Sequence, residues 1–247
     1  MSVEFGPPAE GIRPRAVAVR GGQALLALLS ALVAAWTVTP AFRAAASALG
    51  AADGSAAMAV AATVGQYVGF AVAAVLFVVY AGDRDLLRAR VPTRREAALA
   101  VAGSVGLIVA GYAIIAAFAA VGITPSTNRA LRNPPPYFLA MIPLSFLAVA
   151  VGEELVFRGV VQGELRRALG PAGAVAVASL LFGAIHFGAG AGTTEQQLVY
   201  VVIATVLGAV LGVLYEYTEN LVVPVVVHGA YNAVQFAVQY ASATGLA

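Results

Sequence analysis

Residues 151–159, Val-Gly-Glu-Glu-Leu-Val-Phe-Arg-Gly, place two adjacent carboxylates and an arginine inside a long apolar stretch. Charged side chains at the centre of a bilayer cost about 2.5–3.5 kcal/mol each on insertion scales, so they are rare and mark functional sites. This stretch therefore decides two things. The fold must be a membrane bundle, and the chemistry is expected where the charges lie.

The composition of the whole chain also predicts a membrane-embedded fold. Its 247 residues are 61% hydrophobic and 11% charged, whereas a soluble domain is about a quarter charged and about half apolar. There is no cysteine, which excludes disulfides, thiolate metal sites and a cysteine nucleophile. A net charge of +2 is too small to indicate nucleic-acid binding.

Apolar blocks of membrane-spanning length predict an all-α, polytopic transmembrane helical bundle with about seven spans. Residues 1–20 are polar and are expected to form a cytoplasmic tail, and residues 21–247 to form a single transmembrane domain. The predicted spans lie near residues 22–42, 56–81, 97–121, 137–169, 172–187, 196–215 and 221–240.

The arginine distribution predicts the orientation of the bundle. The connection 82–96 holds five of the 14 arginines, and the positive-inside rule places such a loop in the cytoplasm. Seven spans then leave the N-terminus inside and the C-terminus outside. The chain is expected to be a multi-pass protein of the cell (plasma) membrane.

Two histidines, the only ones in the chain, lie inside predicted spans. Glu153 lies 17 residues before Gly170, and His186 lies 16 residues after it. A helical hairpin that turns at Gly170-Pro171 would hold both at roughly 25 Å from the turn. His228 lies roughly 15 Å into the last span. The three side chains can therefore converge at inner-leaflet or mid-membrane depth.

Spacing within each helix separates the expected roles. Glu154 and Arg158 are four residues apart and are expected to pair. Glu153 is rotated by about 100° from Glu154, so in a regular helix the two carboxylates do not address one group. Glu153 is therefore predicted to serve the chemistry and Glu154 a supporting charge network. His228 and Asn232 are also four residues apart and can face one substrate group. The alternative is that the charged residues only hold the helices together.

A carboxylate, two imidazoles and an amide that are buried together suit the activation of a water molecule. The carboxylate can act as a general base. The imidazoles can orient the water, stabilise an oxyanion or hold a divalent metal such as zinc. Other patterns of intramembrane proteolysis do not occur in the sequence, which has no His-Glu-x-x-His, no aspartate within a span and no Gly-x-Ser-x-Gly. Hydrolysis of an amide bond near the bilayer is the leading reaction class.

These residues form three motifs that resemble those of the CPBP family, the CAAX proteases and bacteriocin-processing enzymes, also called Abi. The family includes the type II CAAX prenyl endopeptidases. The resemblance covers about residues 137–239, so the motif-bearing core, about 137–240, falls in the C-terminal four helices. The motifs are Glu153-Glu154-x-x-x-Arg158, Phe182-x-x-x-His186 and His228-x-x-x-Asn232.

The resemblance implies an intramembrane endopeptidase. Glu153 and His186 would activate water, while His228 and Asn232 would bind the scissile carbonyl or complete the polar site. Members are described both as metalloproteases and as metal-independent glutamate proteases. If a metal is present, Glu153, His186 and His228 are its expected ligands. The expected partners are membrane lipid and a peptide or lipid-anchored protein substrate. Supporting roles fall to the remaining motif residues, Glu154, Arg158 and Phe182.

Two other functional classes compete with the enzyme. A non-catalytic membrane scaffold, or a protein for self-immunity against bacteriocins, would keep the same fold, but the intact motifs favour the enzyme. A transporter that uses Glu153 and Arg158 in an ion path is disfavoured because the sequence lacks the repeat symmetry of many transporters. The Gly-rich segment 188–194 is expected to be a flexible connector, with a border of the substrate path as the alternative.

Overall fold

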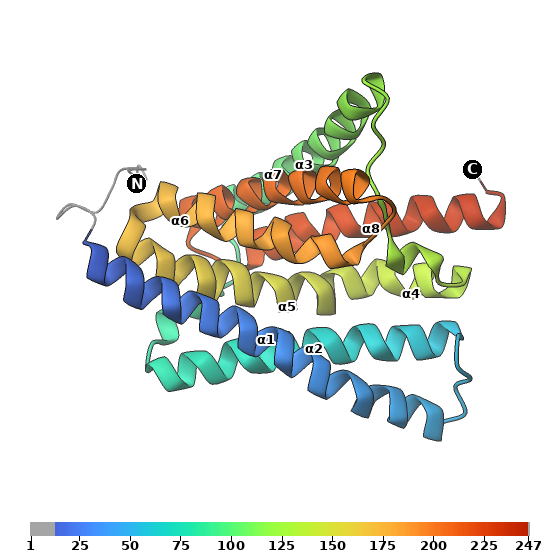
Figure 1. The fold of residues 1–247 in the computed structure, drawn as a ribbon, viewed down its shortest axis with the longest axis horizontal. Coiled ribbons are helices and arrows are strands. Elements are labelled where there is room, and N and C mark those ends of the chain that lie inside the picture. The colour runs from blue at the N-terminus through green and yellow to red at the C-terminus, as the bar shows by residue number, and fades with distance from the viewer. Residues whose placement is uncertain (1–12, 247) are drawn as a thin grey trace.

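The computed structural model describes residues 13–246, which fold into a bundle of long helices (Figure 1). The predicted all-α membrane fold is confirmed. The predicted tail falls partly outside the described residues, at 1–12. The α-helices are α1 (Pro14–Ala48), α2 (Ala56–Ala81), α3 (Arg94–Ala120), α4 (Pro135–Leu144), α5 (Ala150–Glu154), α6 (Gly163–Ile185), α7 (Thr194–Thr218) and α8 (Val222–Thr244). Shorter elements connect them.

The shorter elements are of three kinds. Two π-helical segments flank α5, namely η3 (Ser145–Val149) and η4 (Leu155–Gln162). Three 3₁₀ turns lie between helices, η1 (Arg84–Leu87), η2 (Arg129–Arg132) and η5 (His186–Ala189). Two short strands pair in antiparallel register, β1 (Thr127–Asn128) with β2 (Gly190–Ala191).

Five helical segments within residues 13–246 are long and apolar enough to cross a membrane. One of them, Pro135–Ala189, is 55 residues long and contains both arms of the predicted hairpin. Helix α8, a predicted span, is not among the five. Its polar side chains, which include His228 and Asn232, lower its hydropathy. The chain is a multi-pass membrane protein, and the expected seven spans are not all found by length and composition.

Helix α6 bends sharply at Gly170, where the backbone has φ 72° and ψ 176°. Residues with a side chain rarely adopt this conformation. Pro171 follows directly and suits the first turn of a new helical arm. The chain therefore doubles back, and the second arm of α6 packs on η4, where the rings of Phe182 and Phe157 are in contact (Figure 1). The predicted turn is confirmed.

Helix α1 begins at Pro14, before the predicted start near residue 22. Proline at the first helical position needs no amide hydrogen bond and fits this start. Arg20 lies in the added turns, and its NH1 atom donates to Glu164 Oε2 over 2.8 Å. The helix thus extends beyond its apolar block because a buried carboxylate on α6 pairs with its polar end.

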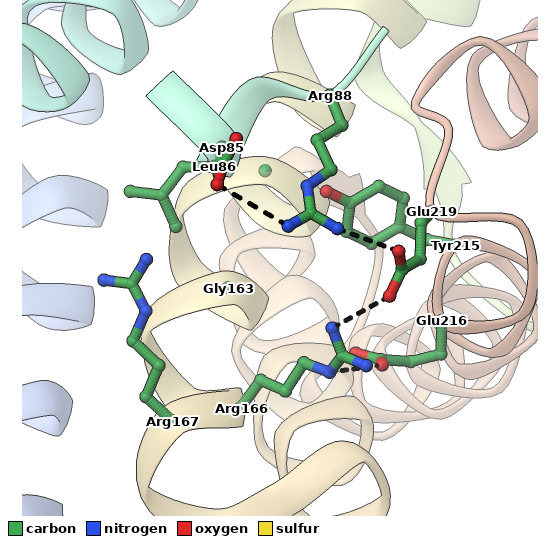
Figure 2. A pocket seen from close by; sticks show the side chains of 10 residues that line it. Asp85, Leu86, Arg88, Gly163, Arg166, Arg167, Tyr215, Glu216 and Glu219 are labelled. Atoms are coloured by element: carbon green, nitrogen blue, oxygen red, sulfur yellow. Dashed lines mark hydrogen bonds and ion pairs between the residues drawn. The ribbon is translucent and has the colours of Figure 1, made fainter. Parts of the chain in front are cut away.

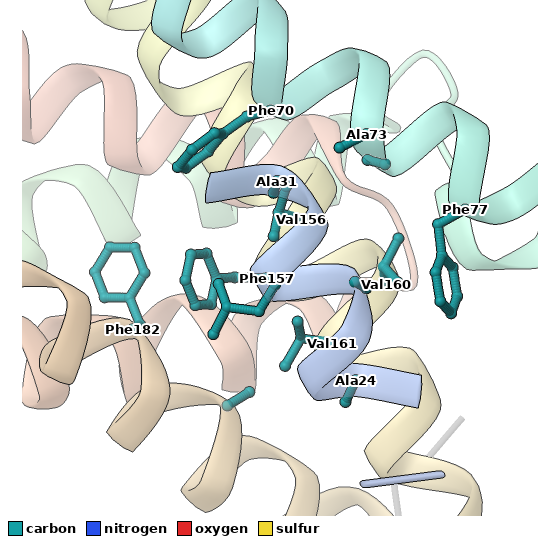
Figure 3. Packing of buried hydrophobic residues seen from close by; sticks show 14 of the residues in the cluster. Ala24, Ala31, Phe70, Ala73, Phe77, Val156, Phe157, Val160, Val161 and Phe182 are labelled. Atoms are coloured by element: carbon teal, nitrogen blue, oxygen red, sulfur yellow. The ribbon is translucent and has the colours of Figure 1, made fainter. Parts of the chain in front are cut away.

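The largest hydrophobic cluster joins the N-terminal helix pair to the motif-bearing segment (Figure 3). Alanines of α1, among them Ala24 and Ala31, are buried against η4, where Phe157 and Val160 are 0% exposed. Phe70 and Phe77 reach the same cluster from α2. Helix α3 packs instead on α7 and α8. Helices α1 and α2 therefore form one wall of the segment that carries the charges.

Candidate active site

Glu153 and Glu154 end the short helix α5, between the two π-helical segments. π-helical turns are rare and occur frequently at functional sites. Glu153 is 5% exposed and Glu154 is 0% exposed. The regular helix assumed from the sequence is therefore interrupted where the charges lie.

His228 lies between the two carboxylates. Its Nδ1 atom is 2.8 Å from Glu154 Oε1, and its Nε2 atom is 3.5 Å from Glu153 Oε2. The expectation that Glu153 and Glu154 do not address one group is wrong. The two ring nitrogens lie on different edges of the imidazole, so carboxylates on adjacent residues can each meet one of them. A carboxylate only accepts, so Nδ1 carries the proton that is donated to Glu154.

The predicted pair between Glu154 and Arg158 is present in the interior. Arg158 Nε lies 3.2 Å from Glu154 Oε2, and both side chains are 0% exposed. Arg158 also donates from NH2 to the carbonyl of Gly208 over 3.0 Å. Its guanidinium lies 5.0 Å from the ring centroid of Phe182. A desolvated cation–π contact of this kind contributes about 2 kcal/mol. Glu154 and Arg158 therefore hold α5, η4 and α7 together behind His228.

Phe182 and His186 form the third part of the site. The two ring centroids are 4.5 Å apart, and His186 Nδ1 lies 2.7 Å from the carbonyl oxygen of Phe182. A carbonyl oxygen only accepts, so Nδ1 carries a proton. In the neutral ring, Nε2 is then a free acceptor. The Phe182 ring also contacts that of His228, with centroids 5.9 Å apart.

A single cavity of about 360 Å³ brings the predicted site residues together. Glu153, His186, His228 and Asn232 all line it. Its volume lies within the range of ligand pockets, roughly 300–1,000 Å³. The lining is part polar and part apolar. Further polar lining residues are Thr63, Gln66, Tyr67, Asn128, Arg129, Tyr137 and Tyr200.

Tyr67 is a site residue that the sequence analysis missed. It comes from α2, and its hydroxyl donates to Glu153 Oε1 over 3.2 Å. The close approach of α2 depends on Gly152, because a Cβ there would lie 3.0 Å from the Tyr67 carbonyl oxygen. A tyrosine within an apolar span was visible in the sequence. Nothing in its spacing tied α2 to the helix of Glu153.

The Gly-rich segment 188–194 is not a free connector. Its strand β2 pairs with β1, with Thr127 opposite Ala191 and Asn128 opposite Gly190. Ala189 and Asn128 both line the cavity. The less favoured alternative, that this segment borders the substrate path, agrees better with the structure.

The predicted metal ligands Glu153, His186 and His228 come from three stretches of the chain and line the same cavity. Within residues 13–246, no three His, Asp or Glu side chains gather closely enough to hold an ion. Glu153 and His228 are close to each other. His186 shares their cavity, and the contact of its Nδ1 atom with the Phe182 carbonyl oxygen leaves its Nε2 atom free. Glu153, His186 and His228 line one cavity, and the predicted metal at these three residues stays a prediction.

A second polar region follows Arg158 along the same helical stretch, and Figure 2 shows its outer part with Arg88, Arg166, Glu216 and Glu219. We call it the arginine–acid network. Gln162 donates to Gly212 O over 3.1 Å and to Glu216 Oε1 over 2.9 Å. Arg166 pairs with Glu216 at 2.9 Å and with Glu219 at 3.3 Å. The network consists of Gln162, Arg166, Glu216, Glu219 and Arg88, whose NH1 atom lies 2.8 Å from Glu219.

Comparisons with known proteins agree with the motif pattern. Residues 135–234 match the family described as Type II CAAX prenyl endopeptidase Rce1-like. A protein of Bacillus subtilis (strain 168), named uncharacterized protein YpbD, is 34% identical over 88 residues. That match covers 36% of this chain and 40% of the Bacillus protein. No solved structure matches significantly. The resemblance to the CAAX protease family is confirmed over the segment that carries the three motifs.

Proposed function

We propose that this chain, whose residues 135–234 match the type II CAAX prenyl endopeptidases, is an intramembrane endopeptidase. It would hydrolyse a peptide bond of a membrane-inserted or lipid-anchored substrate. One observation carries the proposal. Glu153, His186, His228 and Asn232 come from three separate stretches of the chain and line one cavity inside a membrane bundle.

Glu153 is the proposed general base. One of its oxygens accepts from Tyr67, and the other is 3.5 Å from His228 Nε2. A water beside Glu153 and His186 would attack the scissile carbonyl carbon, and its proton would pass to Glu153. The C–N bond then breaks, and the same proton is returned to the leaving amine. His186 would orient the water through its free Nε2 atom.

Asn232, through its amide donors, and His228, through Nε2 of a ring protonated at both nitrogens, are proposed to bind the oxygen of the scissile carbonyl. Asn232 has no hydrogen bond to any residue in 13–246, so its amide donors are free to face a substrate. Removing one preorganised donor of this kind from other hydrolases costs about 10²–10³ in kcat. Glu154 would keep the His228 ring in place through Nδ1. No step here needs a metal ion.

The proposed orientation has the arginine-rich connection 82–96 in the cytoplasm, with the N-terminus on the same side. The proposed location is the plasma membrane. The substrate would reach the cavity from the bilayer or its surface, because the cavity lies among membrane helices.

The test is cleavage of quenched fluorescent peptides by the purified protein in lipid nanodiscs. Glu153→Gln keeps the shape of the side chain and removes the base, so we expect cleavage to fall by about 10²–10⁴-fold. Cleavage by the His186→Gln protein should fall to a similar extent. Glu195→Gln, at an exposed glutamate in the first turn of α7, serves as the matched control and should keep full activity.

Retained cleavage in both Glu153→Gln and His186→Gln would refute the proposal, provided that both proteins keep the thermal stability of the parent. Chelation and dialysis separate the two forms of the mechanism. Activity that survives both supports water activation by Glu153. Activity that is lost and then restored by zinc would replace that mechanism with a metal-dependent one.

A further inference from the structure

The two ends of the bundle differ in charge and in how they relate to the catalytic cavity. One end, which we call the arginine-rich end, comprises the connection 82–96, the hairpin turn of α6 and the start of α1. Ion pairs join these segments. Arg167 pairs with Asp83 and with Glu164, and Glu164 also pairs with Arg20 of α1. The C-terminus lies at the opposite end of the bundle (Figure 1).

A closed layer separates the cavity from the arginine-rich end. Glu153, in the cavity wall, lies 17 residues before the turn at Gly170. Every residue from 156 to 162 is buried, which is about two turns of helix. Phe157 and Arg158 are 0% exposed within this stretch. Because all faces of the helix are covered there, no passage runs along it from the cavity to the hairpin turn.

The cavity reaches the surface at the opposite end. The second arm of α6 runs away from the hairpin turn and ends at η5, where His186 and Ala189 are partly exposed and line the cavity. Residues 128–130, which follow α3, form the facing part of the wall. Arg129 is exposed, and its Nε atom donates to the Gly190 carbonyl over 2.9 Å. The opening therefore lies beside the ribbon of β1 and β2.

The arginine distribution relates this opening to the two sides of the membrane. The connection 82–96 alone holds five of the 14 arginines, whereas the opposite end carries Arg43, Arg129 and Arg132. The positive-inside rule assigns the end with the excess to the cytoplasm. We propose that the catalytic cavity opens on the external side of the membrane, so that its substrate is a peptide segment presented on that side. This inference rests on the proposed function and adds the side from which the substrate comes.

A peptide confined to the cytoplasmic side would meet the arginine–acid network instead of the cavity. Arg166 pairs there with Glu216 and Glu219. The buried residues 156–162 lie between these ion pairs and Glu153. Cleavage from the cytoplasmic side would therefore require the closed layer to separate.

The first test measures the direction of the cavity without cleavage. The chain has no cysteine, so a single introduced cysteine reports which side its position faces. Ala189→Cys places a thiol in the cavity wall, and Ala89→Cys places one at an exposed position of the arginine-rich end. Spheroplasts of a bacterial expression host are treated with a membrane-impermeant maleimide before and after permeabilisation. We expect Ala189→Cys to be labelled in intact spheroplasts and Ala89→Cys only after permeabilisation.

A second reporter guards against a misfolded variant. Gly188→Cys lies beside Ala189, and a Cβ added at Gly188 meets no described atom within 4 Å. It should be labelled like Ala189→Cys. Labelling of Ala89→Cys in intact spheroplasts would overturn the inference. Failure of both Ala189→Cys and Gly188→Cys to react before permeabilisation would overturn it as well.

The second test measures cleavage from each side. The probe is a quenched fluorescent peptide with several charged residues, which keep it from crossing the bilayer. Sealed right-side-out vesicles should cleave it, whereas inverted vesicles should cleave it only after detergent opens them. Cleavage by sealed inverted vesicles at the same or a higher rate would overturn the inference. If no preparation cleaves the peptide, detergent included, the proposed function is refuted, and the labelling result alone decides the direction of the cavity.

Discussion

The cavity and the arginine–acid network are both polar regions inside an apolar bundle, but their polar groups are satisfied differently. In the network, Arg166 and Glu216 each have a partner of opposite charge, and Gln162 bonds to a backbone carbonyl and a carboxylate. In the cavity, the Asn232 amide has no partner within residues 13–246. The first region is held together by its own ion pairs and hydrogen bonds, with Gln162 Oε1 as a buried atom that has no hydrogen-bond partner among the described residues. The second region keeps donors that can bind a ligand.

The two regions share one helix face. Glu154, Arg158, Gln162 and Arg166 follow one another at four-residue spacing, from the His228 ring to the hairpin turn. Glu153 lies just outside this row and reaches the cavity. The same stretch thus supplies a supporting row, which begins at Glu154, and a reactive carboxylate, Glu153. The two roles fall to adjacent residues, which point in different directions around the helix axis. Substitutions in the row should change stability, and substitutions in the cavity should change activity.

The largest expected effect is on stability, from Arg158→Met. This change leaves the fully buried Glu154 without its cation, and removal of one partner from a buried pair costs about 3–5 kcal/mol. We expect a large fall in the thermal unfolding temperature of the purified protein. The double variant Glu154→Gln with Arg158→Met removes both charges and should recover most of that loss. A normal unfolding temperature in Arg158→Met alone would remove the distinction between row and cavity.

Asn232→Ala tests the cavity side of the comparison. If Asn232 donates to the scissile carbonyl, its loss should reduce kcat by about 10²–10³-fold. Its amide has no protein partner in residues 13–246, so the unfolding temperature should stay near that of the parent. Steady-state kinetics and thermal unfolding on the same preparation check both statements. A variant that is unstable but fully active would assign Asn232 to helix packing.

The smaller cavity effect is expected from Tyr67→Phe. The hydroxyl that donates to Glu153 Oε1 is lost while the ring stays, and a hydrogen bond to a charged group contributes about 1.5–3 kcal/mol. We expect kcat to fall by about tenfold or more with KM unchanged. Tyr137→Phe is the control, since that hydroxyl lines the same cavity but contacts Thr63 at 3.1 Å. Equal losses in both variants would mean that Tyr67 acts only through packing.

The row and the cavity also differ in how far the sequence predicted them. The pair Glu154–Arg158 and the turn at Gly170 follow from spacing and from local backbone preference, and both are present. Local patterns of this kind do not depend on which helices become neighbours. The three motif helices were predicted to converge because the hairpin fixes their heights.

Contacts that depend on packing between distant helices were not predictable in the same way. Tyr67 reaches Glu153 where Gly152 allows α2 to lie close to α5, and no spacing pattern within α2 predicts that contact. The shared imidazole of His228 was missed because a regular helix was assumed where two π-helical segments occur. Strand β1 pairs with β2, which lies more than sixty residues later in the chain. The sequence therefore did not predict that Arg129 contacts Gly190.

The smallest effect is expected from Glu219→Gln at the outer end of the network. Glu219 pairs with Arg88 at 2.8 Å and with Arg166 at 3.3 Å, and all three side chains are 38–43% exposed. Exposed ion pairs contribute about 0–1 kcal/mol, so the unfolding temperature should fall by less than about 4 °C. Most of that difference should disappear in 1 M salt, where exposed charges are screened. Glutamine keeps the left-handed backbone at this position, φ 46°, so the measurement reports charge alone. A loss as large as that of Arg158→Met would show that the outer pairs are as essential as the buried one, because the row would then act as one cooperative unit from the hairpin turn to His228.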